Sequence, residues 1–322
     1  MGRREWIAGL ASAIGVENLD VELLAKARRS ARSKRPGTRF ALERLLELSF
    51  RAGESAKEPA LRYAVDAAGV WPADRAPMVE CCLAGVGRTA DASGLGELLQ
   101  EDPKALEYIG AEHAASGAIM RSKTYWGRAL SVQRILSVLP PQLCEAGQAS
   151  DRAVLSLWPE WKTFRFVGID FCASGPPRVK LYYPPRDCEG DLRIETLVEL
   201  CAAMGVPAPV DQFAKLCYLV LDNIPVVPAT AFILGIVLGA EPSLKFSIAP
   251  EAYRGGARSA PAKAEALAVA FGLDPAALQA GADALRRYCP AGNILSLETL
   301  CAEFPSGGQP RVLTYYRLRS AS

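Results

Sequence analysis

The strand-like segments of this chain come in pairs joined by short turns, and this pairing limits the folds open to it. The clearest pair is Thr163–Cys172 with Arg178–Tyr183, joined across a turn rich in glycine and proline. Helical spacing follows it at Ile194–Met204 and Gln212–Leu221. Further pairs are Leu106–Glu112 with Ala118–Trp126, Ala229–Leu238 with Ser243–Ala249, and Leu295–Phe304 with Arg311–Arg319. The order of two antiparallel strands and then two helices recurs about five times.

This repeat predicts an antiparallel sheet, because parallel α/β folds alternate strands and helices singly. Ten antiparallel strands in one sheet curl, and closure into a barrel removes the unpaired edges. Side chains just fill the interior of an eight-stranded barrel, so a ten-stranded barrel leaves a lumen wide enough for ligands. We therefore expect an α+β fold with residues 1–322 as a single domain. Its core is a closed ten-stranded antiparallel barrel with a polar lumen, surrounded by helices. In the first hairpin, Ala60–Ala67 reads as a strand, and Thr38–Leu48 is ambiguous between strand and helix.

Several of the strands carry a cation and a hydroxyl on the same face. In a strand, residues i and i+2 share a face, so a lysine followed two positions later by a tyrosine presents both groups together. Polar groups fall mostly on this parity, with Asp170 and Thr314 as exceptions. Cations and phenols converging from four strands predict a site for a multiply charged anion such as a phosphate ester. The residues of this pattern are Lys123, Tyr125, Lys180, Tyr182, Lys245, Arg311 and Tyr315.

The composition argues against several other kinds of site. The net charge is only +2, with 37 basic and 35 acidic side chains, which disfavours bulk nucleic-acid binding. Nine cysteines without a C-x-x-C pair, and the single His113, argue against a disulfide framework and a zinc site. No apolar run reaches about 18 residues and the N-terminus is too polar for a secretion signal, so we expect a cytoplasmic protein with no membrane segment. Neither D-D-x-x-D segments nor glycine-rich nucleotide motifs occur.

An ordered set of segments resembles the ABBA-barrel (PT-barrel) aromatic prenyltransferases. These segments are SKTYW at 122–126, FRFVGIDF, RVKLYYPP, SLKFSIAP and RVLTYYRL, within a resemblance that spans roughly residues 4 to 319. The likeness is greatest to the soluble bacterial branch that acts on phenols and naphthalene-type aromatics. It implies an enzyme, active as a monomer, that moves a dimethylallyl or geranyl group from its diphosphate to an electron-rich aromatic small molecule. The ring attacks in a Friedel–Crafts manner, while cations stabilise the departing diphosphate and aromatic rings shield the allylic carbocation.

The resemblance also assigns roles to individual positions. The residues expected at the diphosphate are Arg62, Lys123, Tyr125, Lys180, Lys245 and Arg311. Those expected at the aromatic acceptor are Arg165, Val167, Ile169 and Ile233. Tyr182 and Tyr315 are expected beside the reacting groups, with Asp66 as a candidate proton acceptor.

Two departures from the family pattern shape these expectations. Some members bind Mg²⁺ through an aspartate in the second strand, and here the matching position is Arg62. A guanidinium cannot ligate Mg²⁺ but can neutralise diphosphate, so we predict that no metal or other cofactor is required. Indole- and peptide-acting relatives place a glutamate base near this strand, where this chain offers only Glu58 and Asp66. A phenolic acceptor is therefore favoured, with indole or peptide prenylation, or a non-catalytic barrel that binds a lipid or phosphate, as alternatives.

Overall fold

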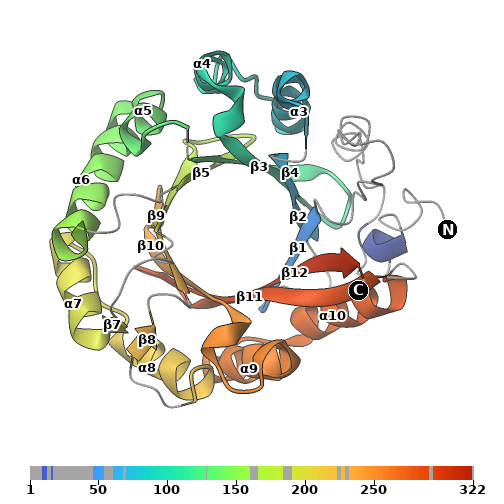
Figure 1. Ribbon diagram of the computed structural model, residues 1–322, viewed down its shortest axis with the longest axis vertical. Coiled ribbons are helices and arrows are strands. Elements are labelled where there is room, and N and C mark those ends of the chain that lie inside the picture. Colours follow the sequence, from blue (N-terminus) through green and yellow to red (C-terminus); the bar gives the residue numbers. More distant parts are fainter. Residues whose placement is uncertain are drawn as a thin grey trace.

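Ten strands close into an antiparallel barrel in the computed structural model, which describes residues 9–12, 16, 46–53, 61–67, 70–127, 129–159, 166–183, 191–222, 226–228, 232–289 and 293–320. Figure 1 looks down this barrel, whose ring closes where β1 pairs with β12. The barrel strands are β1 (Leu46–Arg51), β2 (Leu61–Asp66), β3 (Leu106–His113), β4 (Ile119–Gly127), β5 (Phe166–Cys172), β6 (Arg178–Tyr183), β9 (Phe232–Leu238), β10 (Ser243–Ile248), β11 (Asn293–Pro305) and β12 (Arg311–Ser320). Their order is β1-β12-β11-β10-β9-β6-β5-β4-β3-β2. The predicted fold class is confirmed.

Helices surround this ring on the outside, following the chain order (Figure 1). They are α3 (Pro72–Ala84), α4 (Leu95–Glu101), α5 (Val132–Ser137), α6 (Pro141–Leu157), α7 (Ile194–Ala203), α8 (Val210–Leu219), α9 (Gly256–Ala270) and α10 (Ala276–Tyr288). The structure also contains short 3₁₀ turns, η3 (Pro103–Ala105) and η6 (Pro250–Ala252), and a separate two-stranded sheet of β7 (Asp191–Arg193) and β8 (Val226–Pro228). Among the helices that the structure describes, none is both long and apolar enough to cross a membrane.

Each of four hairpins is followed by two helices, as the strand pairing predicts. The prolines at 140 and 141 separate α5 from α6. Ser131 caps α5 by accepting a hydrogen bond from the backbone N–H of Arg134 at 3.1 Å. Pro141 then occupies the first position of α6, where the missing N–H would have had no partner inside the helix. The ambiguous segment at 38–48 ends in a strand, because β1 begins at Leu46.

The barrel wall separates an apolar outer face from a polar inner face. Val179 and Leu181 of β6 lie on the outer face and are fully buried in the hydrophobic core beneath the helices. Leu244 and Phe246 of β10 do the same. Because alternate residues of each strand face outward, burial of this layer against α-helices fixes the register and leaves the other parity to line the lumen.

Candidate active site

Charged side chains fill the inner parity of the barrel. Arg62 lies opposite Glu112, and Glu112 lies opposite Arg121 on the next strand, so strand pairing holds these three in one row. The pocket in the lumen at this level contains about 590 Å³ of space between atoms, a figure that includes open solvent. Its lining residues are Glu47, Ser49, Arg51, Arg62, Tyr63, Ala64, Glu112, Arg121, Lys123, Tyr125, Arg178, Lys180, Lys245, Glu303, Leu313 and Tyr315.

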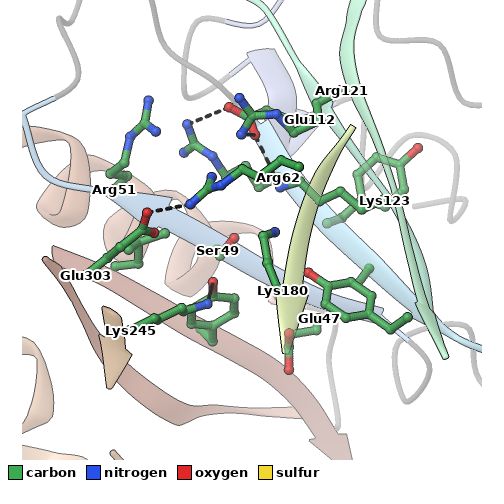
Figure 2. Close-up of a pocket in the computed structure, with 16 residues that line it drawn as sticks. Glu47, Ser49, Arg51, Arg62, Glu112, Arg121, Lys123, Lys180, Lys245 and Glu303 are labelled. Carbon is green, nitrogen blue, oxygen red and sulfur yellow. Dashed lines mark hydrogen bonds and ion pairs between the residues drawn. The ribbon is translucent and has the colours of Figure 1, made fainter. Parts of the chain in front are cut away.

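One end of the lumen carries a ring of cations, here called the cationic collar. It consists of Arg51, Arg62, Arg121, Lys123, Arg178, Lys180 and Arg311. These residues come from the early parts of β2, β4, β6 and β12 and from the end of β1, which antiparallel pairing brings to the same end of the barrel. Figure 2 shows Arg62, Lys123 and Lys180 directed into a common space.

Three buried carboxylates lie between these cations. Glu112 forms ion pairs with Arg62 at 3.0 Å, Lys123 at 3.2 Å and Arg121 at 3.3 Å. Asp170 pairs with Lys180 at 2.5 Å. Glu303 is held by Arg311 at 2.8 Å, by Arg178, and by the hydroxyl of Ser243, which donates a hydrogen bond at 3.0 Å.

These contacts shift the titration of the acids and of Lys180. Burial alone would raise the pKa of Glu112, but Lys123, Arg62 and Arg121 hold that pKa well below its usual range. Glu303 is affected in the same way, and Arg178 contributes most to lowering its pKa to about 2 against the effect of burial. For Lys180, burial lowers the pKa to about 7, although Asp170 opposes the shift. The carboxylates are therefore ionised near neutral pH, and the collar still contains more cations than anions.

An aromatic layer lies directly next to the collar, further along the lumen. The rings of Phe166 and Tyr182 stack with centroids 4.5 Å apart, and Tyr125 lies 6.0 Å from Tyr182. The ammonium of Lys245 donates a hydrogen bond to the Tyr315 hydroxyl at 2.8 Å and lies 4.8 Å from the centre of that ring. It also lies 5.6 Å from the centre of the Tyr182 ring. An ammonium therefore lies within cation–π distance of two tyrosine rings of this layer.

Two inward-facing glycines give the tyrosine rings room. Gly168 lies opposite Tyr125, and Gly235 lies opposite Tyr182 in neighbouring strands. A Cβ at position 168 would lie 3.0 Å from the Tyr125 ring, and one at 235 would lie 3.3 Å from the Tyr182 ring. Because both distances are tighter than ordinary contact, any larger side chain would push a ring into the lumen. The glycines therefore help set the lumen width at the aromatic layer.

A second polar group of residues lies at the other end of the lumen, beyond the aromatic rings. Glu47 pairs with Arg317 at 3.6 Å, and Tyr108 hydrogen-bonds to Arg317. Burial raises the pKa of Glu47, against the opposing effect of Arg317. Asp66 belongs to the same end, opposite Tyr108 in the sheet. Figure 2 shows Glu47 well separated from Glu112 and the collar.

The structure brings most of the predicted site residues together. In the lumen or at its rim lie Arg62, Asp66, Lys123, Tyr125, Lys180, Tyr182, Lys245, Arg311 and Tyr315. Ile233 is on the inner parity too, because it pairs with Ser247, two positions from Lys245. Arg165 lies outside the described residues.

Val167 and Ile169 do not reach the lumen, and the expectation that they contact an acceptor is corrected here. They pair with Leu181 and Val179, share the outer face with them, and are fully buried in the core under the helices. The lumen parity of β5 instead contains Phe166, Gly168 and Asp170. Asp170, expected to be an exception to the polar face, is therefore part of it.

Apart from Asp66, the prediction from sequence did not include the carboxylates of the site. Glu112 could have been found by continuing the hairpin across the turn at 114–117, because that register sets it opposite Arg121. Arg121 and Arg178 each precede a predicted lysine by two positions, so strand alternation alone places them on its face. Glu303 could have been found in the same way, because the register of the last hairpin sets it opposite Arg311, a predicted site residue. Glu47 had no such signal, because its partner Arg317 is distant in sequence.

Several solved structures that share this architecture are prenyltransferases. A 6-dimethylallyltryptophan synthase from Micromonospora olivasterospora, in complex with DMASPP and Trp, is 16% identical over 97% of this chain and 95% of its own, with a TM-score of 0.68. The apo form of prenyltransferase PriB is 16% identical over 97% and 94%, with a TM-score of 0.66. A 5-dimethylallyltryptophan synthase from Streptomyces coelicolor is 17% identical over 96% and 94%, with a TM-score of 0.61.

Comparisons of sequence give no further assignment, since no protein-family model and no curated protein matches this chain. At 16–17% identity, the structural likeness shows the fold. The chain is a PT barrel (ABBA barrel) of the kind seen in those prenyltransferases.

Proposed function

We propose that this protein is an aromatic prenyltransferase, which moves an allylic group from its diphosphate to an electron-rich aromatic small molecule. One observation carries the proposal: an excess of cations adjoins a layer of tyrosine rings inside a closed barrel. The cations suit a diphosphate and the rings suit an allylic carbocation. The solved prenyltransferases of the same fold include complexes with a diphosphate and with a dimethylallyl thiolodiphosphate, which supports the same reading.

The collar would hold the diphosphate and stabilise it as it leaves. Arg62, Lys123 and Lys180 supply donors from three strands to oxygens that gain charge when the allylic C–O bond breaks. The electron pair of that bond leaves with the pyrophosphate. Because these donors are fixed by strands and buried ion pairs, they need little reorganisation as the charge develops.

The aromatic layer would receive the allylic group. Tyr125, Tyr182 and Tyr315 present π faces that favour the carbocation and keep water from it. An aromatic carbon of the acceptor attacks the allylic carbon, and the new C–C bond leaves one proton to be removed from the ring.

Glu47 is placed to take a proton from the acceptor. It lies beyond the aromatic layer from the collar, and burial raises its pKa towards the range of a general base. A phenolic acceptor remains the first candidate, since its own hydroxyl activates the ring. This carboxylate favours an indole as the second candidate, because an indole N–H needs an acceptor when the ring becomes positively charged.

The collar would take the place of a metal ion at the diphosphate. Arg62 and its neighbours already supply positive charge there, and a guanidinium at position 62 can neutralise diphosphate but cannot ligate Mg²⁺. We therefore propose that the reaction needs no Mg²⁺.

The test is to incubate the protein with dimethylallyl or geranyl diphosphate, EDTA, and a panel of phenols, naphthols and indoles. Prenylated product and released pyrophosphate in equal amounts are expected, with both reduced in Lys180→Met. Product that forms only after Mg²⁺ is added would refute metal independence. Tight binding of the donor without release of pyrophosphate from any acceptor would instead identify a non-catalytic, ligand-binding barrel.

A further inference from the structure

The cationic collar contains its own anions. Glu112 on β3, Asp170 on β5 and Glu303 on β11 each lie among cations from neighbouring strands, at separate points around the ring. The Glu112 and Glu303 side chains are only 5–6% exposed. The N–H groups that they engage are those that face the space proposed for the diphosphate.

The three carboxylates together carry about the charge of a bound diphosphate. The lowered pKa values of Glu112, Asp170 and Glu303 keep all three ionised near neutral pH. A buried ion pair contributes little net stability compared with apolar residues of similar size, because desolvation offsets the attraction. Stabilisation of the barrel therefore does not explain well why three carboxylates lie here. An effect of these carboxylates on ligand binding explains their position better.

We propose that Glu112, with Asp170 and Glu303, acts as an internal counter-anion that competes with diphosphate for the collar. When the donor binds, some of the ion pairs that Glu112 forms are replaced by ion pairs with the diphosphate oxygens. The cations of these pairs are Arg62, Arg121 and Lys123. When pyrophosphate leaves, the carboxylate takes these cations back, which lowers the barrier to release. The inference rests on the proposed function, because release of pyrophosphate matters to turnover only in a transferase.

A purely structural role for Glu112 predicts the opposite change in anion affinity when the carboxylate is removed. If the carboxylate served only to hold three mutually repelling cations in place, removing it would scatter them and weaken anion binding. If it competes, removing it leaves more positive charge facing the ligand and strengthens anion binding. The affinity for a simple anion therefore separates the two roles without any need for catalysis.

The experiment is calorimetric titration with inorganic pyrophosphate in EDTA, at about pH 6, where Lys180 with its pKa of about 7 is charged. Glu112→Gln and Glu303→Gln should each bind pyrophosphate about tenfold more tightly than the wild type, the order expected for losing one competing charge at hydrogen-bonding distance. Glu241→Gln is the matched control, since Glu241 pairs with Arg311 but its side chain is 43% exposed. Its affinity should change little, because exposed pairs are screened. Glu112→Asp keeps the charge and should stay close to the wild type.

In rapid-mixing assays Glu112→Gln should give a burst of prenylated product and then a slower steady state, with kcat and the donor KM lowered together. Unchanged or weaker pyrophosphate binding in the Gln variants would overturn the inference, even in an active enzyme. Tighter binding without product in any variant would instead refute the proposed function and leave the competition intact. Should Glu112→Gln fail to fold, as judged by thermal unfolding, Glu303→Gln decides the question alone.

Discussion

Lys180 carries a charge that should make donor binding depend on pH. Burial lowers the pKa of its ammonium to about 7, and Arg178 and Lys123 add repulsion that Asp170 opposes. The ammonium is therefore charged below that pH and becomes neutral above it. A bound diphosphate favours the charged form, so it raises the pKa and binds most tightly where the ammonium is already present. Donor affinity should fall as the pH rises through 7.

The size of the effect follows from the strength of one charge-assisted hydrogen bond. Such a bond contributes about 1.5–3 kcal/mol, which corresponds to a rise of about one to two pKa units on binding. The dissociation constant of the donor should therefore increase about 10- to 100-fold between about pH 7 and pH 9, and then level off. Ionisation of the diphosphate itself acts in the opposite direction, so comparison between variants is essential.

Titration calorimetry with a non-reactive thiolodiphosphate analogue, repeated across this pH range, measures the effect. Lys180→Arg keeps its charge throughout and should lose the decrease in affinity at high pH. Lys180→Met should bind weakly at all pH values and show no decrease either. If Lys180→Met retained the wild-type pH profile, the titrating group would be another residue and the reasoning would be wrong.

Three further predictions concern other parts of the lumen. Glu47→Gln should lower kcat by about 10²-fold or more while the donor KM stays unchanged, since a general base acts after the donor is bound; an equal loss in pyrophosphate binding would contradict this role. Gly235→Ala should reduce turnover of geranyl diphosphate more than that of dimethylallyl diphosphate, because the added Cβ crowds the Tyr182 ring; equal losses with both donors would argue against a width limit there. Ile169→Val should lower the free energy of unfolding by about 0.5–1.5 kcal/mol and leave the acceptor KM unchanged, since the side chain lies in the outer core; a changed KM would return it to the acceptor site.

The sequence was sufficient to predict the barrel because its strands are short, paired and separated by strong turn signals. The spacing of Lys180 and Tyr182 identified the inner face of β6 directly, because strand alternation has a period of two. In the same way, Lys123 and Tyr125 identified the inner face of β4. Long-range closure between β1 and β12 was inferred only from the need to remove edges, and the structure confirms it.

The inner face of β5 was assigned the wrong way round for a physical reason. Because Arg165 is charged, the residues that share its face were predicted to line the lumen. Phe166 and Gly168, on the other face, look apolar in the sequence. In this barrel aromatic rings line part of the lumen, so an aromatic ring and a glycine can face the lumen as well as a cation can. A shift of one position exchanges the faces of a whole strand, so Val167 and Ile169 were placed inside with it.

Glu112, Glu303 and Glu47 were not predicted because the predicted site was built from strands that carry cations. Glu112 lies directly opposite Arg121 in the β3–β4 hairpin, so extending the predicted hairpin register would have identified it. Glu303 likewise lies opposite Arg311 in the last hairpin, and its further contact with Arg178, 125 positions away in sequence, needs the closed barrel. Glu47 lies in a segment whose sequence does not decide between strand and helix, so its face could not be assigned.

A crystal structure with a dimethylallyl thiolodiphosphate bound would test the central claim most directly. The account predicts the diphosphate at the collar, with oxygens within hydrogen-bonding distance of Arg62, Lys123 and Lys180, and the allylic tail against the rings of Tyr125 and Tyr182. A diphosphate found on the outside of the barrel, or at the Arg317 end of the lumen, would contradict it.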